Sequence, residues 1–170
     1  YAWCLMANQV HLQMRTGTKP LPTVMSGLLT GYAMGFNRRN RRSGHLFQNR
    51  YKSTVVEDER YFLSLVRYIH LNPLRAGRVR RLSELARYRW SGHSVLMGYQ
   101  EMGWQDVDEV LSRFGTRTTK ARRELSIFMG QIEGRKEEAV FGEDRFARSK
   151  STKAPVAGRI VRAKRGDDPG

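Results

Sequence analysis

The feature that most constrains this chain is an alternation of apolar and polar residues between positions 8 and 15. The apolar residues are Val10, Leu12 and Met14, and the polar residues between and beside them are Gln9, His11, Gln13 and Arg15. A period of two residues is typical of a β-strand that buries one of its faces. We therefore expect a strand whose polar face carries Gln9 and His11 side by side. Such a pair can hold a metal ion or orient a phosphate.

The residues before this strand, Tyr1 to Met6, are apolar and aromatic. They predict either a separate buried strand or the first half of one long strand that runs to Arg15. In the second case Ala7 and Asn8 would form a slight irregularity within it.

Charge indicates the class of partner. The chain of 170 residues has 31 Lys and Arg against 16 Asp and Glu, a formal net charge of +15. Such an excess favours nucleic acid as the partner, and the alternative is a ribosome-like or merely adhesive basic protein. The single cysteine, Cys4, excludes a disulfide framework within the chain and favours a reducing cytoplasmic setting. No apolar run reaches the length of a membrane span, so we expect no membrane partner.

A helix is predicted from Leu21 to Phe36, where apolar residues recur every three or four positions. Gly27, Gly31 and Gly35 recur every four residues within it. They would either let this helix approach a sheet closely or merely weaken it.

The densest basic cluster follows this helix, between Asn37 and Ser43, and a strand is predicted from Tyr51 to Val56. The basic residues of the cluster are Arg38, Arg39, Arg41 and Arg42, and Arg50 and Lys52 lie two residues apart at the start of the predicted strand. We interpret the four arginines of the cluster as phosphate contacts, because guanidinium groups match phosphate oxygens, and the alternative is a solvated loop.

An amphipathic helix is predicted to begin at Asp58, its N-cap, and to end before Pro73. Tyr68 and Asn72 are one turn apart and project from the same side. Taken alone, Tyr68 is more simply a half-buried helical tyrosine and Asn72 a residue that ends a helix. Arg75 falls in a basic connector that follows.

The rest of the chain predicts helices after Asp106 and over residues 120–131 that serve for packing, with a helix-turn-helix DNA reader as an alternative. From Arg148 the composition predicts a disordered basic tail. We expect a domain over residues 1–98, a helical extension over 99–147 and the tail over 148–170.

Four segments taken together resemble one family. They are CLMANQVHL from Cys4, GHLFQNRYKS from Gly44, RYIHLNPLRAG from Arg67 and YRWS from Tyr88. The chain resembles the single-tyrosine HUH transposases, most closely those associated with repetitive extragenic palindromes. The resemblance covers about residues 1–98 and continues weakly through the two later helices.

The resemblance implies an α+β fold, an HUH or ferredoxin-like two-layer sandwich in which helices pack on an antiparallel sheet. It also implies a Tyr68 nucleophile and a divalent ion, Mg²⁺ or Mn²⁺, bound by Gln9, His11 and Asn72. Tyr68 would cleave single-stranded DNA beside a hairpin and form a 5′-phosphotyrosine, in a monomer or a homodimer. The DNA would be bound by Arg38, Arg39, Arg41, Arg42, Arg50, Lys52 and Arg75.

The chain departs from the family pattern at two points. Gln9 stands where the family has its first histidine, and an amide oxygen lacks the basicity of imidazole. A further strand and helix would be expected before Tyr1. An active nuclease and strand transferase therefore competes with a catalytically silent remnant that binds DNA hairpins. A generic basic RNA-binding protein is a third reading, and the paired spacing of Tyr68 with Asn72 and of Gln9 with His11 argues against it.

Overall fold

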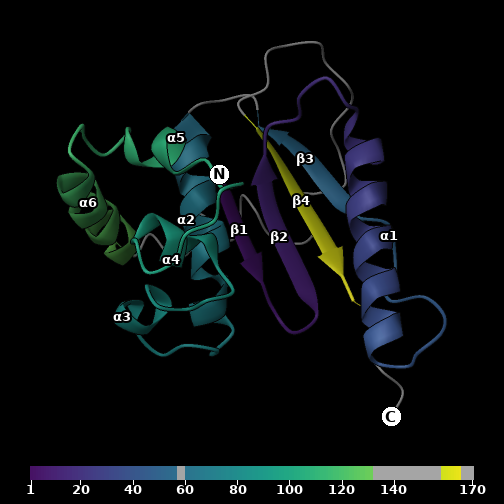
Figure 1. Ribbon diagram of the computed structural model, residues 1–170. Coiled ribbons are helices and arrows are strands. Elements are labelled where there is room, and N and C mark those ends of the chain that lie inside the picture. The colour runs from purple at the N-terminus through teal and green to yellow at the C-terminus, as the bar shows by residue number, and fades with distance from the viewer. Residues whose placement is uncertain (57–59, 132–157, 166–170) are drawn as a thin grey trace.

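The computed structural model describes residues 1–56, 60–131 and 158–165, which combine a small antiparallel sheet with packed helices (Figure 1). In chain order the elements are β1 (Ala2–Leu5), β2 (Gln9–Met14), α1 (Leu21–Arg39), β3 (Lys52–Val56), α2 (Arg60–Arg75), α3 (Leu82–Leu85), α4 (Gly92–Leu96), α5 (Val107–Leu111), α6 (Thr118–Gly130) and β4 (Gly158–Lys164). The predicted α+β class is confirmed. In this part of the chain no helix is both long and apolar enough to cross a membrane.

The first fifteen residues form a hairpin. β1 and β2 pair antiparallel with Cys4 opposite His11, and the Met6 N–H donates to the Gln9 carbonyl across the turn at 2.8 Å. Of our two predictions for residues 1–15, the separate first strand is therefore the correct one.

The described residues contain four strands in one sheet, in the order β1-β2-β4-β3, with antiparallel pairing throughout. The central strand β4 contradicts the disorder that we predicted for the tail from residue 148, at least for residues 158–165. Val161 and Ala163 are buried, and their two-residue spacing is a strand signal within a segment rich in basic residues. The rest of that tail and residues 132–147 of the predicted extension lie outside the described residues.

Helices cover both faces of the sheet, whereas we expected two layers. His11 and Gln13 of β2 face α2, and the Gln13 Nε2 donates to the Phe62 carbonyl at 3.4 Å. Leu12 and Met14 face the other way, into a second apolar cluster built on α1. The polar face of β2 is thus buried under α2 rather than exposed to solvent.

Of the two roles that we considered for the α1 glycines, close approach to the sheet is wrong for Gly27 and Gly31. A Cβ atom at Gly27 or Gly31 would meet nothing within 4 Å, so both positions face solvent. The helix also continues beyond the predicted end at Phe36 and takes in Arg38 and Arg39 as its last turn. Cations there face the negative end of the helix dipole, which stabilises the extension.

Helix α2 runs through Pro73 to Arg75, and the end that we predicted before Pro73 is wrong. Pro73 has no N–H for the carbonyl of Ile69, four residues earlier. The side chain of Asn72 replaces it, because its Nδ2 donates to the carbonyls of Ile69 at 3.2 Å and Tyr68 at 3.0 Å. The predicted N-cap, Asp58, lies outside the described residues.

The later helices share one core with α2. Val110 of α5 and Leu125 of α6 are fully buried in the same cluster as Leu65 and Ile69 of α2. The predicted cap of α5 is confirmed, since Asp106 Oδ1 accepts from the Glu109 N–H at 3.0 Å.

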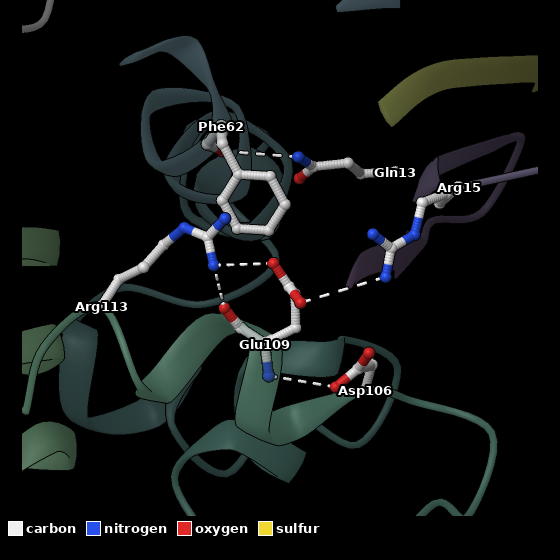
Figure 2. Close-up of polar contacts among 6 residues, drawn as sticks. All are labelled: Gln13, Arg15, Phe62, Asp106, Glu109 and Arg113. Atoms are coloured by element: carbon white, nitrogen blue, oxygen red, sulfur yellow. Dashed lines mark hydrogen bonds and ion pairs between the residues drawn. The ribbon is translucent and has the colours of Figure 1, made fainter. Parts of the chain in front are cut away.

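Polar contacts attach this part of the chain to the sheet. Figure 2 shows the Glu109 carboxylate between Arg113 Nη1, at 2.8 Å, and Arg15 Nη2 beyond the end of β2, at 4.0 Å. Deeper in the molecule, Gln105 accepts from Trp3 Nε1 at 2.7 Å and donates to the Gly92 carbonyl at 3.1 Å. These contacts attach α5 and the segment around Gln105 to the β1–β2 hairpin.

Candidate functional site

The candidate site is centred on Tyr68, in the middle of α2. Its side chain points at β2, where its ring meets His11 edge-on, with the ring centroids 6.3 Å apart and the planes at 80°. Tyr68 is 8% exposed and His11 is 1% exposed. Helix-on-sheet packing therefore brings the predicted nucleophile to a predicted metal ligand, although 57 positions separate them in the chain.

Gln9 and His11 form a pair of potential metal ligands on the same strand. Gln9 Oε1 and His11 Nε2 are 3.3 Å apart. Two ligands of an octahedral Mg²⁺, each at about 2.1 Å from the ion, are about 3 Å apart. The separation of these two atoms therefore fits joint ligation of one divalent ion.

Asn72 lies one turn after Tyr68, and its Nδ2 is committed to the helix backbone. Its Oδ1 is therefore the atom that can act as a ligand. The three predicted ligands are one imidazole and two amides, and carboxylate charge is what strengthens the sites of hard cations. In the part of the chain that the structure describes, no group of three His, Cys, Asp or Glu side chains is arranged to hold a metal. The donor set fits a weak site for a hard divalent ion.

Arg75 contacts Tyr68 from the last turn of α2. Its guanidinium sits over the Tyr68 ring, 5.1 Å from the centroid, and its Nη1 donates to the Tyr68 carbonyl at 3.2 Å. We had assigned Arg75 to a connector because we ended the helix at Pro73. The seven-residue spacing from Tyr68, two helical turns, was the signal that could have revealed this contact.

Lys52 begins β3 on the face of the sheet that carries His11. Both residues lie opposite position 162 of β4, Lys52 from one side and His11 from the other. Two strand spacings, about 10 Å, separate them. The exposed Lys52 therefore lies on the same face of the sheet as His11, two strands away from it.

The other predicted DNA contacts are on a different face. Arg38 and Arg39 end α1, which packs on the face of the sheet opposite α2, and Arg41 and Arg42 follow directly. Arg50 lines a groove beside α1. The basic residues that we grouped together are thus divided between the two faces of the sheet.

Two kinds of buried group near the site, a thiol and two imidazoles, are uncharged at neutral pH. Cys4 lies opposite His11 in the hairpin, but burial raises the pKa of its thiol to about 12. It is therefore neither a thiolate ligand nor a nucleophile at neutral pH. His70 faces away from His11 toward His93, and burial lowers the pKa of both imidazoles below 6.5.

Comparison of the chain with family models, with curated proteins and with solved structures finds no match. The function is therefore inferred from the chemistry of the residues that meet around Tyr68. These are a phenol, an imidazole, two amides and a guanidinium, with an ammonium group two strands away from the imidazole on the same face of the sheet.

Proposed function

We propose that the chain is a nuclease and strand transferase for single-stranded DNA beside a hairpin, with Tyr68 as the nucleophile. The observation that carries this proposal is the packing of Tyr68 against His11, with Gln9 bonded to His11 and Arg75 over the tyrosine ring. A tyrosine with a purely structural role needs neither a pair of potential metal ligands on one side of its ring nor a guanidinium group over the ring. We propose that the protein works in the cytoplasm as a monomer or a homodimer.

The reaction would be a transesterification. The Tyr68 Oη attacks the phosphorus atom of a phosphodiester, so an Oη–P bond forms and the bond from phosphorus to the 3′ oxygen breaks. The phenolic proton ends on the departing oxygen, which becomes a free 3′-OH. The energy of the original bond is kept in the phosphotyrosine, and a 3′-OH can therefore reverse the step and join strands.

Some neighbouring residues would bind the DNA phosphates and others would bind the metal ion. Arg75 and Lys52 neutralise the phosphates on either side of the scissile bond. Gln9, His11 and the Oδ1 of Asn72 hold a Mg²⁺ or Mn²⁺ ion, which when bound supplies polarisation of the scissile phosphate. Because these ligands are uncharged, the DNA phosphate provides the negative charge that the ion needs. Metal and DNA should therefore bind together more tightly than either alone.

A second candidate function is a DNA-hairpin binder that has lost cleavage. Two observations favour it, the presence of Gln9 at the first ligand position and the exposure of only 8% of Tyr68. In this version Gln9 keeps its hydrogen bond to His11. The basic residues then bind DNA without chemistry.

A covalent adduct between protein and DNA distinguishes the two functions. The purified chain is incubated with Mn²⁺ and a hairpin-flanked single-stranded oligonucleotide whose label stays on the tyrosine-linked fragment. The products are separated on a denaturing gel, where an adduct migrates as labelled protein. We expect an adduct that Tyr68→Phe abolishes and that Tyr61→Phe retains. Tyr61 is the matched control because it lies on the same helix and is 48% exposed.

The Gln9→His variant completes the test. If the wild-type chain forms no adduct and Gln9→His forms one, the protein is the silent binder and the site is otherwise intact. If neither chain forms an adduct although both bind the oligonucleotide, the tyrosine mechanism is refuted.

A further inference from the structure

A groove of about 920 Å³ lies on the side of the sheet away from Tyr68. It runs between α1 and the segment 44–53, and its lining includes Thr30, Met34, His45, Phe47, Arg50 and Tyr51. Tyr51 packs into the apolar cluster of α1, which places the groove on the α1 face. Its volume is at the upper end of the range, about 300–1,000 Å³, that is typical of ligand sites.

Aromatic rings form one part of this groove. Phe47 lines it, and the ring of Phe47 lies 6.2 Å, centroid to centroid, from the ring of Tyr32, which is beside the groove and not one of its lining residues. Tyr32 stacks in turn on Phe36 at 6.2 Å and remains 49% exposed. Exposed aromatic rings in a groove are the platforms on which unpaired bases stack, and each stacked base contributes about 1–3 kcal/mol.

The charge around the groove has one sign. Residues 1–56 contain no Asp or Glu, and their basic residues are Arg15, Lys19, Arg38, Arg39, Arg41, Arg42, Arg50 and Lys52. Among the described residues that line the groove, none carries a carboxylate, and Arg50 and His45 are exposed there. The described residues that line the groove therefore attract a polyanion and include none that repels it.

We propose that this groove binds unpaired nucleotides of single-stranded DNA, with bases against Phe47 and Tyr32 and phosphates toward Arg50 and the end of α1. This proposal rests on the proposed function, which supplies the single-stranded DNA. In Figure 1 the C-terminal end of α1 and the turn between β1 and β2 lie toward the same end of the sheet. One strand can therefore pass around that end from the groove to the face that carries Tyr68.

The test adds a carboxylate inside or outside the groove. Thr30→Glu introduces the charge in the lining, and Thr23→Glu introduces the same charge on the same helix outside it. Both threonines are exposed, so neither change disturbs the core. The affinity for a labelled deoxythymidine oligonucleotide, which has no hairpin and no defined cleavage site, is measured by fluorescence anisotropy. We expect Thr30→Glu to weaken binding about tenfold and Thr23→Glu less than threefold.

The result is independent of cleavage, because each variant is also made with Tyr68→Phe. If the difference between the threonine variants persists while the wild-type chain forms no adduct, the groove is a DNA site and only the proposed chemistry fails. If the variants bind equally while an adduct forms, the groove proposal is refuted and the chemistry stands. Binding of a uridine ribo-oligonucleotide as tight as that of the deoxy form would overturn the assignment to DNA.

Discussion

Acid should destabilise this fold through a buried pair of histidines. His70 of α2 and His93 of α4 are 0% and 3% exposed, and their ring centroids are 5.5 Å apart. Among the described residues, no group bonds either ring nitrogen of His70 or the Nδ1 of His93. Burial lowers the pKa of His93 from 6.5 to about 4, and burial also lowers the pKa of His70 well below 6.5, with His93 as a second cause. Both rings are therefore neutral in the folded chain at pH 7.

The sign and size of this acid destabilisation follow from the difference between the numbers of protons that the unfolded and the folded chain bind. Unfolded histidines take up a proton near pH 6.5, whereas folded His93 does so only near pH 4. Between these values the unfolded state binds more protons, so stability is complete above pH 6.5 and falls as the pH is lowered. Between its folded and unfolded pKa values, each histidine lowers the unfolding free energy by about 1.4 kcal/mol for every pH unit of acidification. His93 alone should therefore remove about 3 kcal/mol of unfolding free energy by pH 4.

Urea unfolding, followed by tryptophan fluorescence at several pH values from 7.5 to 4.5, measures this loss. His93→Gln removes one titrating group and should reduce the slope of unfolding free energy against pH by about 1.4 kcal/mol per unit below pH 6. The exposed His45, replaced by Gln, is the matched control and should leave the slope unchanged. Parallel pH profiles for wild type and His93→Gln would refute the reasoning, whatever the absolute stability of the variant.

Four further substitutions test packing and binding. Gly31→Ala should raise the unfolding free energy by about 1 kcal/mol in thermal or urea unfolding, because the helical position faces open space. Gly92→Ala should lower it by about 1–3 kcal/mol in the same assay, because its Cβ would lie 2.8 Å from side-chain atoms of Trp3 and Gln105. Gln105→Ala should cost about 1–3 kcal/mol by leaving the buried Trp3 Nε1 without its acceptor, and an unchanged urea midpoint would contradict this. Lys52→Gln should reduce the slope of log affinity for single-stranded DNA against log salt by about 0.7, as measured by anisotropy titrations.

Short-range patterns predicted much of the fold. The two-residue period located β2, the three- and four-residue periods located α1 and α2, and Asp106 marked the start of α5. Each of these signals lies within a few residues of the element that it predicts. That is why they could be read without knowing which segments pack together.

The errors in the predicted fold have two sources. One is packing or pairing partners that are distant in the chain, and the other is a local hydrogen bond in which a side chain replaces a backbone donor. β4 is a strand because β2 and β3 pair with it on both sides, and nothing within the basic tail indicates those partners. Helix α2 passes Pro73 because Asn72 supplies the missing donor, although Asn-Pro usually marks a helix end. The alternation in β2 predicted one buried apolar face, but the polar His11 and Gln13 are buried under α2, and the apolar Leu12 and Met14 are only partly buried under α1.

The error at Pro73 also affects the site. Because α2 continues for three more residues, to Arg75, the Arg75 side chain reaches back over Tyr68, and Asn72 remains a helical residue one turn beyond Tyr68. The amide that replaces the proline N–H is the same side chain that the resemblance assigns to the metal. Its Nδ2 bonds the backbone carbonyl of Tyr68, and in the proposed site its Oδ1 would bind the ion, so one residue would both position the proposed nucleophile and complete the proposed ligand set. Asn72→Asp would place charge on the ligand but remove the donor. It should therefore strengthen Mn²⁺ binding, measured by calorimetry, while lowering the unfolding free energy by about 1–3 kcal/mol. Asn72→Ala should lower stability without any gain in Mn²⁺ affinity, and equal affinities for the two variants would remove Asn72 from the ligand set.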